Sequence, residues 1–177
     1  ELLERFEYPW EVINEIPDFI LKLGASLPKD EYDEVREGVW IAKTASVEPS
    51  AYIGAPTIIG HNATIGHCAF IRTCALVGEG ATVGNSTELK NVILFNGVEV
   101  PHYNYVGDSI LGYKAHMGAG SITSNVKSDK TLVVVRIGEG IPTGLKKFGA
   151  MLGDFVEVGC NSVLNPGTVI GRNSNVY

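Results

Sequence analysis

Two basic side chains and one histidine are the residues of this chain best suited to chemistry on a phosphorylated small molecule. Arg72 and Lys90 each stand directly after an aliphatic residue, at Ile71 and Leu89. Two cations placed side by side repel each other by roughly 1 kcal/mol even in water, so a phosphate bound between them would stabilise the pair. An imidazole has an unperturbed pKa of about 6.5 and can take up a proton at physiological pH, which makes His102 the candidate general base.

Each of these residues also has a plainer interpretation. Arg72 and Lys90 can be solvated or paired with Glu79 or Glu88, and a lone histidine is more often a surface or packing residue. The choice depends on whether the fold brings Arg72 and Lys90 together.

A six-residue repeat predicts that fold. Glycine often follows the large apolar residue of each repeat, and a small residue stands two places before it. The apolar residues are Ile41, Val47, Ile53, Ile59, Ile65, Ile71, Val77, Val83, Leu89 and Phe95. Neither an α-helix nor a plain strand has period six, whereas one side of a triangular parallel β-helix does. Three repeats then make one coil, so residues three repeats apart lie about 4.8 Å above one another. This all-β solenoid places Gly54, Arg72 and Lys90, which are three repeats apart, at one corner of successive coils.

The repeat also divides the chain. Residues 1–37 have helical spacing, with Pro17 beginning a second short helix and Gly24 ending it, and predict an N-terminal helical cap over the first coil. A partner-binding segment is the alternative. Residues 38–177 are predicted to form the β-helix. After Phe95 the expected inward positions are Pro101, Val106, Leu111, Met117 and Ile122, and they resume at Leu152, Val158, Leu164, Ile170 and Val176.

Residues 124–150 interrupt the β-helix with a stretch that has no six-residue pattern. Four lysines, Lys127, Lys130, Lys146 and Lys147, give this segment a positive bias in a protein of net charge −6. A long excursion from a compact solenoid usually has a function. We expect it to close over a ligand groove or to contact a neighbouring subunit, and a solvated loop is the alternative.

Composition excludes several classes of function. The net charge of −6 argues against nucleic acid held by bulk electrostatics. No apolar run is long enough to predict a membrane span, and the first residues do not resemble a signal peptide. Cys68, Cys74 and Cys160 have no metal-ligand spacing, which fits reduced thiols in the cytoplasm. The histidine spacings do not converge on a zinc site either, so no metal is predicted.

One long stretch carries a resemblance to a known family. The matching segments are Leu76–Asn85, Glu88–Lys90, His102–Asp108, Leu111–Gly112 and Met117–Asn125. Together they resemble the acetyltransferase domain of the hexapeptide-repeat family of bifunctional glucosamine-1-phosphate acetyltransferases/N-acetylglucosamine-1-phosphate uridyltransferases. The whole chain looks like a short relative, of the kind called UDP-N-acetylglucosamine pyrophosphorylase-related, without a uridyltransferase domain.

The resemblance implies a left-handed β-helix, a homotrimer and acetyl-CoA bound between neighbouring subunits. It implies that His102 is the general base and that Arg72, Lys90 and Tyr105 contact the sugar phosphate. Asn125 or a backbone N–H would stabilise the oxyanion. Ala119 and Asn125 match positions near the acetyl-CoA thioester, and Cys160 falls where a serine contacts the cofactor.

Two substitutions depart from the family pattern. The substrate-contacting asparagine of the family is His116 here, and the tyrosine expected after Asn125 is Val126. The expected reaction is acetyl transfer from acetyl-CoA to an amino-sugar phosphate such as glucosamine-1-phosphate. The alternative is a non-catalytic module or scaffold that binds a sugar phosphate or sugar nucleotide.

Overall fold

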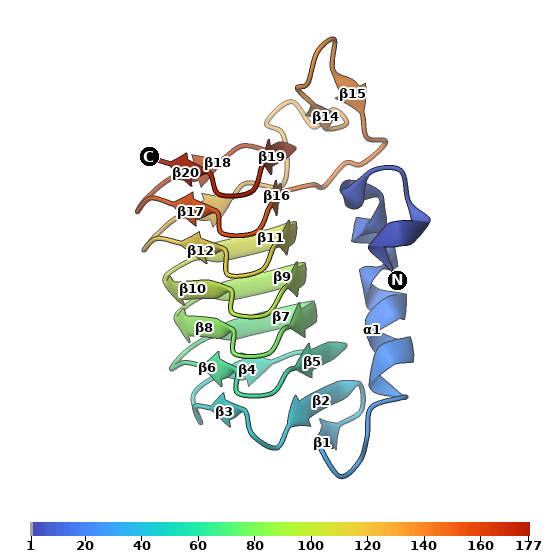
Figure 1. Ribbon diagram of the computed structural model, residues 1–177, viewed down its shortest axis with the longest axis vertical. Helices are drawn as coiled ribbons and strands as arrows, with labels where there is room; N and C mark the ends of the chain where they lie inside the picture. Colours follow the sequence, from blue (N-terminus) through green and yellow to red (C-terminus); the bar gives the residue numbers. More distant parts are fainter. Residues whose placement is uncertain (1) are drawn as a thin grey trace.

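The computed structural model describes residues 2–177, and they form the expected left-handed parallel β-helix, preceded in the chain by short helices. Coils of three short faces stack along one axis (Figure 1). The first face is built from β2 (Val39–Ala42), β5 (Thr57–Ile59), the later parts of β7 (Phe70–Val77), β9 (Glu88–Leu94) and β11 (Tyr105–Leu111), then β16 (Ala150–Leu152) and β19 (Thr168–Ile170).

The second and third faces complete each coil. The second is built from β3 (Ser46–Val47), β6 (Thr64–Ile65), β8 (Thr82–Asn85), β10 (Glu99–His102), β12 (His116–Met117), β17 (Glu157–Val158) and β20 (Asn175–Val176). The third is built from β4 (Tyr52–Ile53), the first residues of β7, β9 and β11, β13 (Ile122–Thr123) and β18 (Val163–Leu164). β7, β9 and β11 therefore run unbroken around the corner between the third and first faces.

The six-residue repeat produces this shape because its apolar and small residues both point inward. The side chains of Ile59, Ile65 and Ile71 are fully buried, as are the small residues Ala63 and Ala75. Glycine at a corner lets one coil lie directly against the next. A Cβ at Gly84 would overlap the Pro101 carbonyl oxygen, so no larger residue fits there without moving the backbone.

The coil length is not constant, and this corrects part of the sequence prediction. Ile71 pairs with Leu89, three repeats on, but Thr73 rather than Arg72 pairs with Lys90. Arg72 is the extra residue of a β-bulge. The predicted stacking of Gly54 with Arg72 is correct, because a Cβ at Gly54 would overlap the Arg72 carbonyl oxygen. The predicted stacking of Arg72 on Lys90 is wrong by one residue.

The shorter coil changes which later residues point inward. Val77 pairs with Leu94 and Val83 with Val100, so these residues are buried. The predicted inward residues Phe95 and Pro101 lie one position too late, and Phe95 is 38% exposed. In the next coil Thr123 pairs with Leu164 and is buried, and the predicted Ile122 is only half-buried. The inward positions at Leu152, Val158 and Leu164 are confirmed.

The helices of the predicted N-terminal cap lie beside the solenoid rather than over its first coil. They are the short 3-10 helices η1 (Leu3–Arg5) and η2 (Pro9–Glu15) and the α-helix α1 (Ile16–Gly24). α1 lies along the side of the solenoid and packs on β5, β7 and β9 of the first face (Figure 1). That face is apolar on its outside as well, through Ile58, Leu76, Ile93, Ile110 and Met151, so it needs a cover. The edge of the first coil is covered by β1 (Tyr32–Arg36), a strand at the end of the same predicted cap segment, which pairs antiparallel with β2.

The excursion between β13 and β16 contains a small antiparallel hairpin, β14 (Val134–Val135) and β15 (Ile141–Pro142). Its base is anchored, because Phe148 is fully buried and its ring lies 5.9 Å from that of Trp10 in the N-terminal segment. The excursion and the helices thus share a second apolar core beside the solenoid. None of the helices within residues 2–177 is both long and apolar enough to cross a membrane.

Substitution of Gly84 by alanine tests the close stacking of the coils. The added methyl group would force the Pro101 backbone away, so the free energy of unfolding should fall by about 1–3 kcal/mol or more. Gly171→Ala is the matched control, because nothing lies within 4 Å of a Cβ at that corner; it should change stability by no more than about 0.5 kcal/mol. Urea denaturation measures both, and equal stabilities would contradict the stacking.

Candidate functional site

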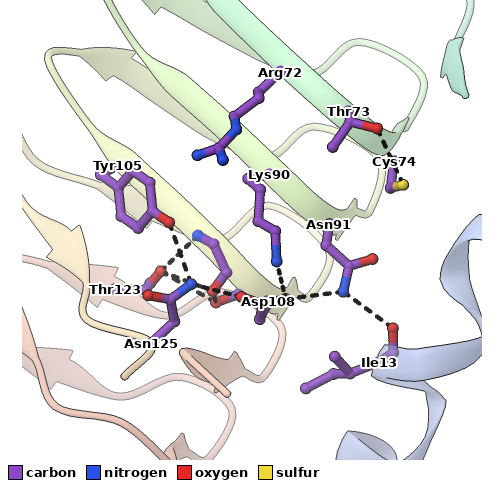
Figure 2. Close-up of polar contacts among 12 residues, drawn as sticks. Ile13, Arg72, Thr73, Cys74, Lys90, Asn91, Tyr105, Asp108, Thr123 and Asn125 are labelled. Atoms are coloured by element: carbon purple, nitrogen blue, oxygen red, sulfur yellow. Dashed lines mark hydrogen bonds and ion pairs between the residues drawn. The ribbon is translucent and has the colours of Figure 1, made fainter. Parts of the chain in front are cut away.

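The corner between the third and first faces gathers most of the predicted site residues. Arg72, Lys90 and Tyr105 lie there on neighbouring strands, and Asn125 joins them from the segment after β13 (Figure 2). The strands turn this corner through residues with left-handed backbone, such as Asn91 and Asp108, whose φ angles are 56° and 48°. Asparagine and aspartate tolerate that conformation better than other residues with a side chain.

Asp108 is the centre of this cluster, and the sequence prediction assigned it no role. Its carboxylate lies 2.7 Å from Lys90 Nζ and accepts hydrogen bonds from Asn91 Nδ2 at 3.0 Å and Asn125 Nδ2 at 2.5 Å. Only 2% of its surface is exposed. Its place in the matching segment His102–Asp108 was a signal, but a strict register of three repeats hid its contact with Asn91, which is 17 residues away.

In this structure Arg72 is paired with Glu88, which is the plainer of the two interpretations of this residue. Its Nη1 lies 3.4 Å from Glu88 Oε1, and both side chains are open to solvent. The positive charges of Arg72 and Lys90 are therefore balanced by the carboxylates of Glu88 and Asp108. Because neither cation is uncompensated, affinity for a phosphate would have to come from the hydrogen-bond donors that remain free.

Tyr105 supplies one such donor. Its hydroxyl oxygen accepts a hydrogen bond from Asn125 Nδ2 at 3.2 Å, which leaves its own hydrogen available. Burial raises the pKa of Tyr105, and the negative charges of Asp108 and Glu88 add to the effect, while the Asn125 hydrogen bond and Arg72 oppose it. The phenol therefore stays protonated, as a donor, throughout the physiological pH range.

The side-chain amide nitrogen of Asn125 faces the cluster and not a ligand. Its amide nitrogen carries two hydrogens, and these point to Asp108 and Tyr105. In this arrangement the amide has no hydrogen left for an oxyanion. Of the two oxyanion donors that the resemblance implies, the backbone N–H is the one that remains.

His102 lies at the opposite edge of the third face, at the end of β10. Its backbone N–H donates to Asn104 Oδ1 at 3.0 Å, and the amide of the buried Asn104 bonds in turn to Gly118 and Ser121. The turn that carries His102 is therefore fixed. The imidazole itself is exposed and has no hydrogen-bond partner within residues 2–177.

Ala119 and Cys160 stack above His102 on successive coils. Gly120 N–H donates to the His102 carbonyl, and Asn161 N–H donates to the Ala119 carbonyl. This register places the predicted base and two predicted cofactor contacts in one column, where Ala119 is half-buried and Cys160 is an exposed free thiol.

His116 lies apart from both groups within one chain. It stands on the second face, opposite Glu99, and its Nδ1 lies 2.7 Å from Glu157 Oε2. Within the described residues, no group of three His, Cys, Asp or Glu side chains lies close enough together to bind a metal ion.

The raised pKa of Tyr105 has a consequence for stability at high pH. An unfolded tyrosine ionises near pH 10, so the contribution of Tyr105 is present below that pH and is lost as the pH rises through its higher folded value. The urea midpoint of the wild type should therefore fall more steeply above about pH 10 than that of Tyr105→Phe. Tyr103→Phe, at a ring that is 64% exposed, is the control and should follow the wild type. Parallel curves for all three proteins would contradict the assignment.

No family model matches the chain, but curated proteins do. It is 41% identical over 90 residues to the Bifunctional protein GlmU of Methanococcus aeolicus, which is 51% of this chain and 22% of that protein. It is 36% identical over 93 residues to a bifunctional sugar-1-phosphate nucleotidylyltransferase/acetyltransferase of Sulfurisphaera tokodaii, which is 52% of this chain and 23% of that protein. The chain thus spans less than a quarter of the length of these relatives.

Two solved structures show the same fold. A hexapeptide transferase family protein from Anaplasma phagocytophilum has a TM-score of 0.58 and 22% identity, over 76% of this chain and 72% of that one. A putative acetyltransferase of Bacillus cereus has a TM-score of 0.60 and 19% identity, over 76% of this chain and 70% of that one. The chain therefore has the same β-helix fold as these two proteins, and over half its length it is similar in sequence to part of the GlmU proteins.

Proposed function

We propose that the protein is an acetyl-CoA-dependent acetyltransferase whose acceptor is an amino-sugar phosphate such as glucosamine-1-phosphate. The observation that carries the proposal is the convergence of Arg72, Lys90 and Tyr105 at one corner, one short face away from the open imidazole of His102. The relatives named as acetyltransferases support the reaction type. Because the match covers under a quarter of those proteins, their substrates alone do not identify the substrate of this chain.

The phosphate would be held by donors that the cluster leaves free. Lys90 has three N–H groups, of which Asp108 accepts one, and the Tyr105 hydroxyl has a hydrogen to give. Arg72 can turn to a phosphate because its bond to Glu88 is long and exposed. Charge-assisted bonds from a planar guanidinium suit phosphate oxygens.

His102 would act at the other end of the same ligand. Three steps along the chain separate it from Tyr105, a span of at most about 10 Å, which suits a sugar phosphate. The acceptor amine would attack the thioester carbonyl, forming the C–N bond as the C–S bond breaks. His102 would take the proton that the amine loses and return it to the departing thiolate of coenzyme A.

The donor would lie along the column of Ala119 and Cys160 beside His102. The excursion offers a place for its phosphates, because a groove of about 640 Å³ between the excursion and the last coils is lined by Arg136 and by Lys127, which is paired with Asp129. The groove begins at Ser124, next to Asn125. We therefore keep the expectation that this segment closes over the acyl donor.

We further propose a cytoplasmic homotrimer. Tyr52, Phe70 and Val163 are exposed apolar residues in the outward column of the third face that also contains Tyr105. Contact with a second copy would bury them. His116, which is remote from the cluster in its own chain, would then be able to approach the site of a neighbour. The three free cysteines fit a reducing compartment.

A non-catalytic binding module remains the second candidate. His116 is paired with Glu157, and Val126 replaces an aromatic family residue, so two positions of the family site are altered. A module of this kind would bind the sugar phosphate without needing the open imidazole of His102.

The substitution His102→Ala separates the two candidates. If His102 removes the proton, turnover of acetyl-CoA with glucosamine-1-phosphate should fall by about 10²–10⁴. Coenzyme A affinity and thermal stability should change little, because the imidazole packs against nothing in the core. Full activity in the variant would disprove the role of His102. A wild type that binds coenzyme A but acetylates no amino-sugar phosphate would favour the binding module.

Removal of the Arg72 guanidinium tests the phosphate site. Arg72→Ala should weaken binding of glucosamine-1-phosphate by roughly 1.5–3 kcal/mol and leave binding of glucosamine unchanged, because only the phosphate meets the guanidinium. Arg172→Ala is the control, since Arg172 makes a similar exposed pair with Asp154 at a remote corner. Calorimetric titration decides the matter, and equal wild-type affinities for the two sugars would exclude the site.

A further inference from the structure

The carboxylate of Asp108 is buried at the centre of the candidate site. Burial of a charge costs free energy unless partners compensate for it, yet Asp108 is almost completely enclosed at a corner where other coils have neutral residues such as Asn91 and Cys74. It does have compensating partners. All three side chains that bond to it, Lys90, Asn91 and Asn125, belong to the site or adjoin it.

An ionised carboxylate only accepts hydrogen bonds, and this decides the orientation of Asn125. The amide nitrogen must face Asp108, and its second hydrogen reaches Tyr105. The amide oxygen of Asn125 then has no partner among residues 2–177 and is free to accept a hydrogen bond from a ligand N–H or O–H. The same carboxylate holds Lys90 Nζ in one place while leaving two of its hydrogens free.

Asn91 shows how firmly this arrangement is held. Its amide nitrogen donates both to Asp108 and, at 3.1 Å, to the carbonyl of Ile13 in η2 (Figure 2). Its own oxygen is buried with no hydrogen-bond partner in the described part of the chain. The amide is therefore oriented by its two acceptors, at the expense of a buried unpaired oxygen. The N-terminal segment thus supports the far side of Asp108.

We propose that Asp108 is a positioning residue, which fixes the Lys90 ammonium as a donor and the Asn125 amide oxygen as an acceptor toward the acceptor substrate. It does not itself touch the substrate, because its side chain is enclosed. The inference rests on the proposed acetyltransferase function for its kinetic consequences, but the restraint of Lys90 by Asp108 can be measured without it.

The test compares Asp108→Asn with wild type and with Asp154→Asn, in which another corner aspartate that pairs with an arginine is neutralised. An asparagine at 108 presents a donor to groups that are all donors, so it should misplace Lys90 and Asn125 with little change in volume. We expect kcat/KM for glucosamine-1-phosphate to fall at least tenfold, with coenzyme A binding unchanged. Asp154→Asn should behave as wild type.

The double variant Asp108→Asn/Asn125→Asp separates positioning from stability. It restores one hydrogen bond between the two positions but reverses its direction, so the thermal midpoint lost in Asp108→Asn should partly return while kcat/KM stays low. Recovery of both would overturn the proposal, because the bond would then matter only for folding.

Limited reductive methylation, read by mass spectrometry, provides a measurement that needs no activity. Loss of the carboxylate removes the ion pair that holds Lys90 Nζ, so Lys90 should be methylated at least several-fold faster in Asp108→Asn. An unchanged rate in a folded variant overturns the proposal. If the wild type transfers no acetyl group, the proposed function fails, and the methylation rate alone still decides whether Asp108 positions Lys90.

Discussion

The hydrogen bonding between coils at the corner of β7 and β9 is the constraint on which the rest of the structure depends. Arg72 is an extra residue at that corner, so the pairing interval shortens by one residue from there to β13. It returns to its earlier length between β16 and β19. A shift of one residue turns an inward side chain outward in a strand. The later coils could keep an apolar interior only because Leu94 and Val100, not Phe95 and Pro101, stand at the inward positions. The same shift stacks Asp108 on Asn91, and its carboxylate also contacts Lys90.

The second constraint is the apolar outer surface of the first face. Most outer faces of a solenoid can be exposed to solvent, but the outside of this face carries the apolar residues Ile58, Leu76, Ile93 and Ile110. The N-terminal helices and the base of the excursion cover it, with Trp10 and Phe148 in contact. This cover also reaches the site, through the Ile13 carbonyl and Asn91. Segments far apart in the sequence are thereby joined at one corner.

Sequence reasoning recovered the solenoid because the six-residue repeat reports directly on which side chains point inward. The matching motifs pointed to Tyr105 and Asn125, which the structure brings together. They also contain His102 and Ala119, whereas Cys160, which completes that column, lies beyond them. Sequence reasoning could not locate the bulge, because Phe95 and Pro101 fit an apolar pattern as well as Leu94 and Val100 do. The missed bulge explains the incorrect stacking of Arg72 on Lys90 and hides the contact of Asp108 with Asn91. The contact of Asp108 with Lys90, three repeats away, fits the strict register, and the sequence prediction assigned it no role. The position of α1 is set by apolar residues on the outside of the first face. The six-residue repeat describes only which side chains point inward, so it could not predict that position.

We interpret the corner as the proposed ligand site, in which Glu88 and Asp108 balance the two cations and a phosphate would be held by Lys90, Tyr105 and the exposed Arg72. A crystal structure of the protein with coenzyme A and glucosamine-1-phosphate tests this most directly. We expect phosphate oxygens about 3 Å from Lys90 Nζ, the Tyr105 hydroxyl and the Arg72 guanidinium, with Arg72 released from Glu88 and the sugar amine facing His102. A sugar phosphate bound elsewhere, with the Arg72–Glu88 pair intact, would contradict it.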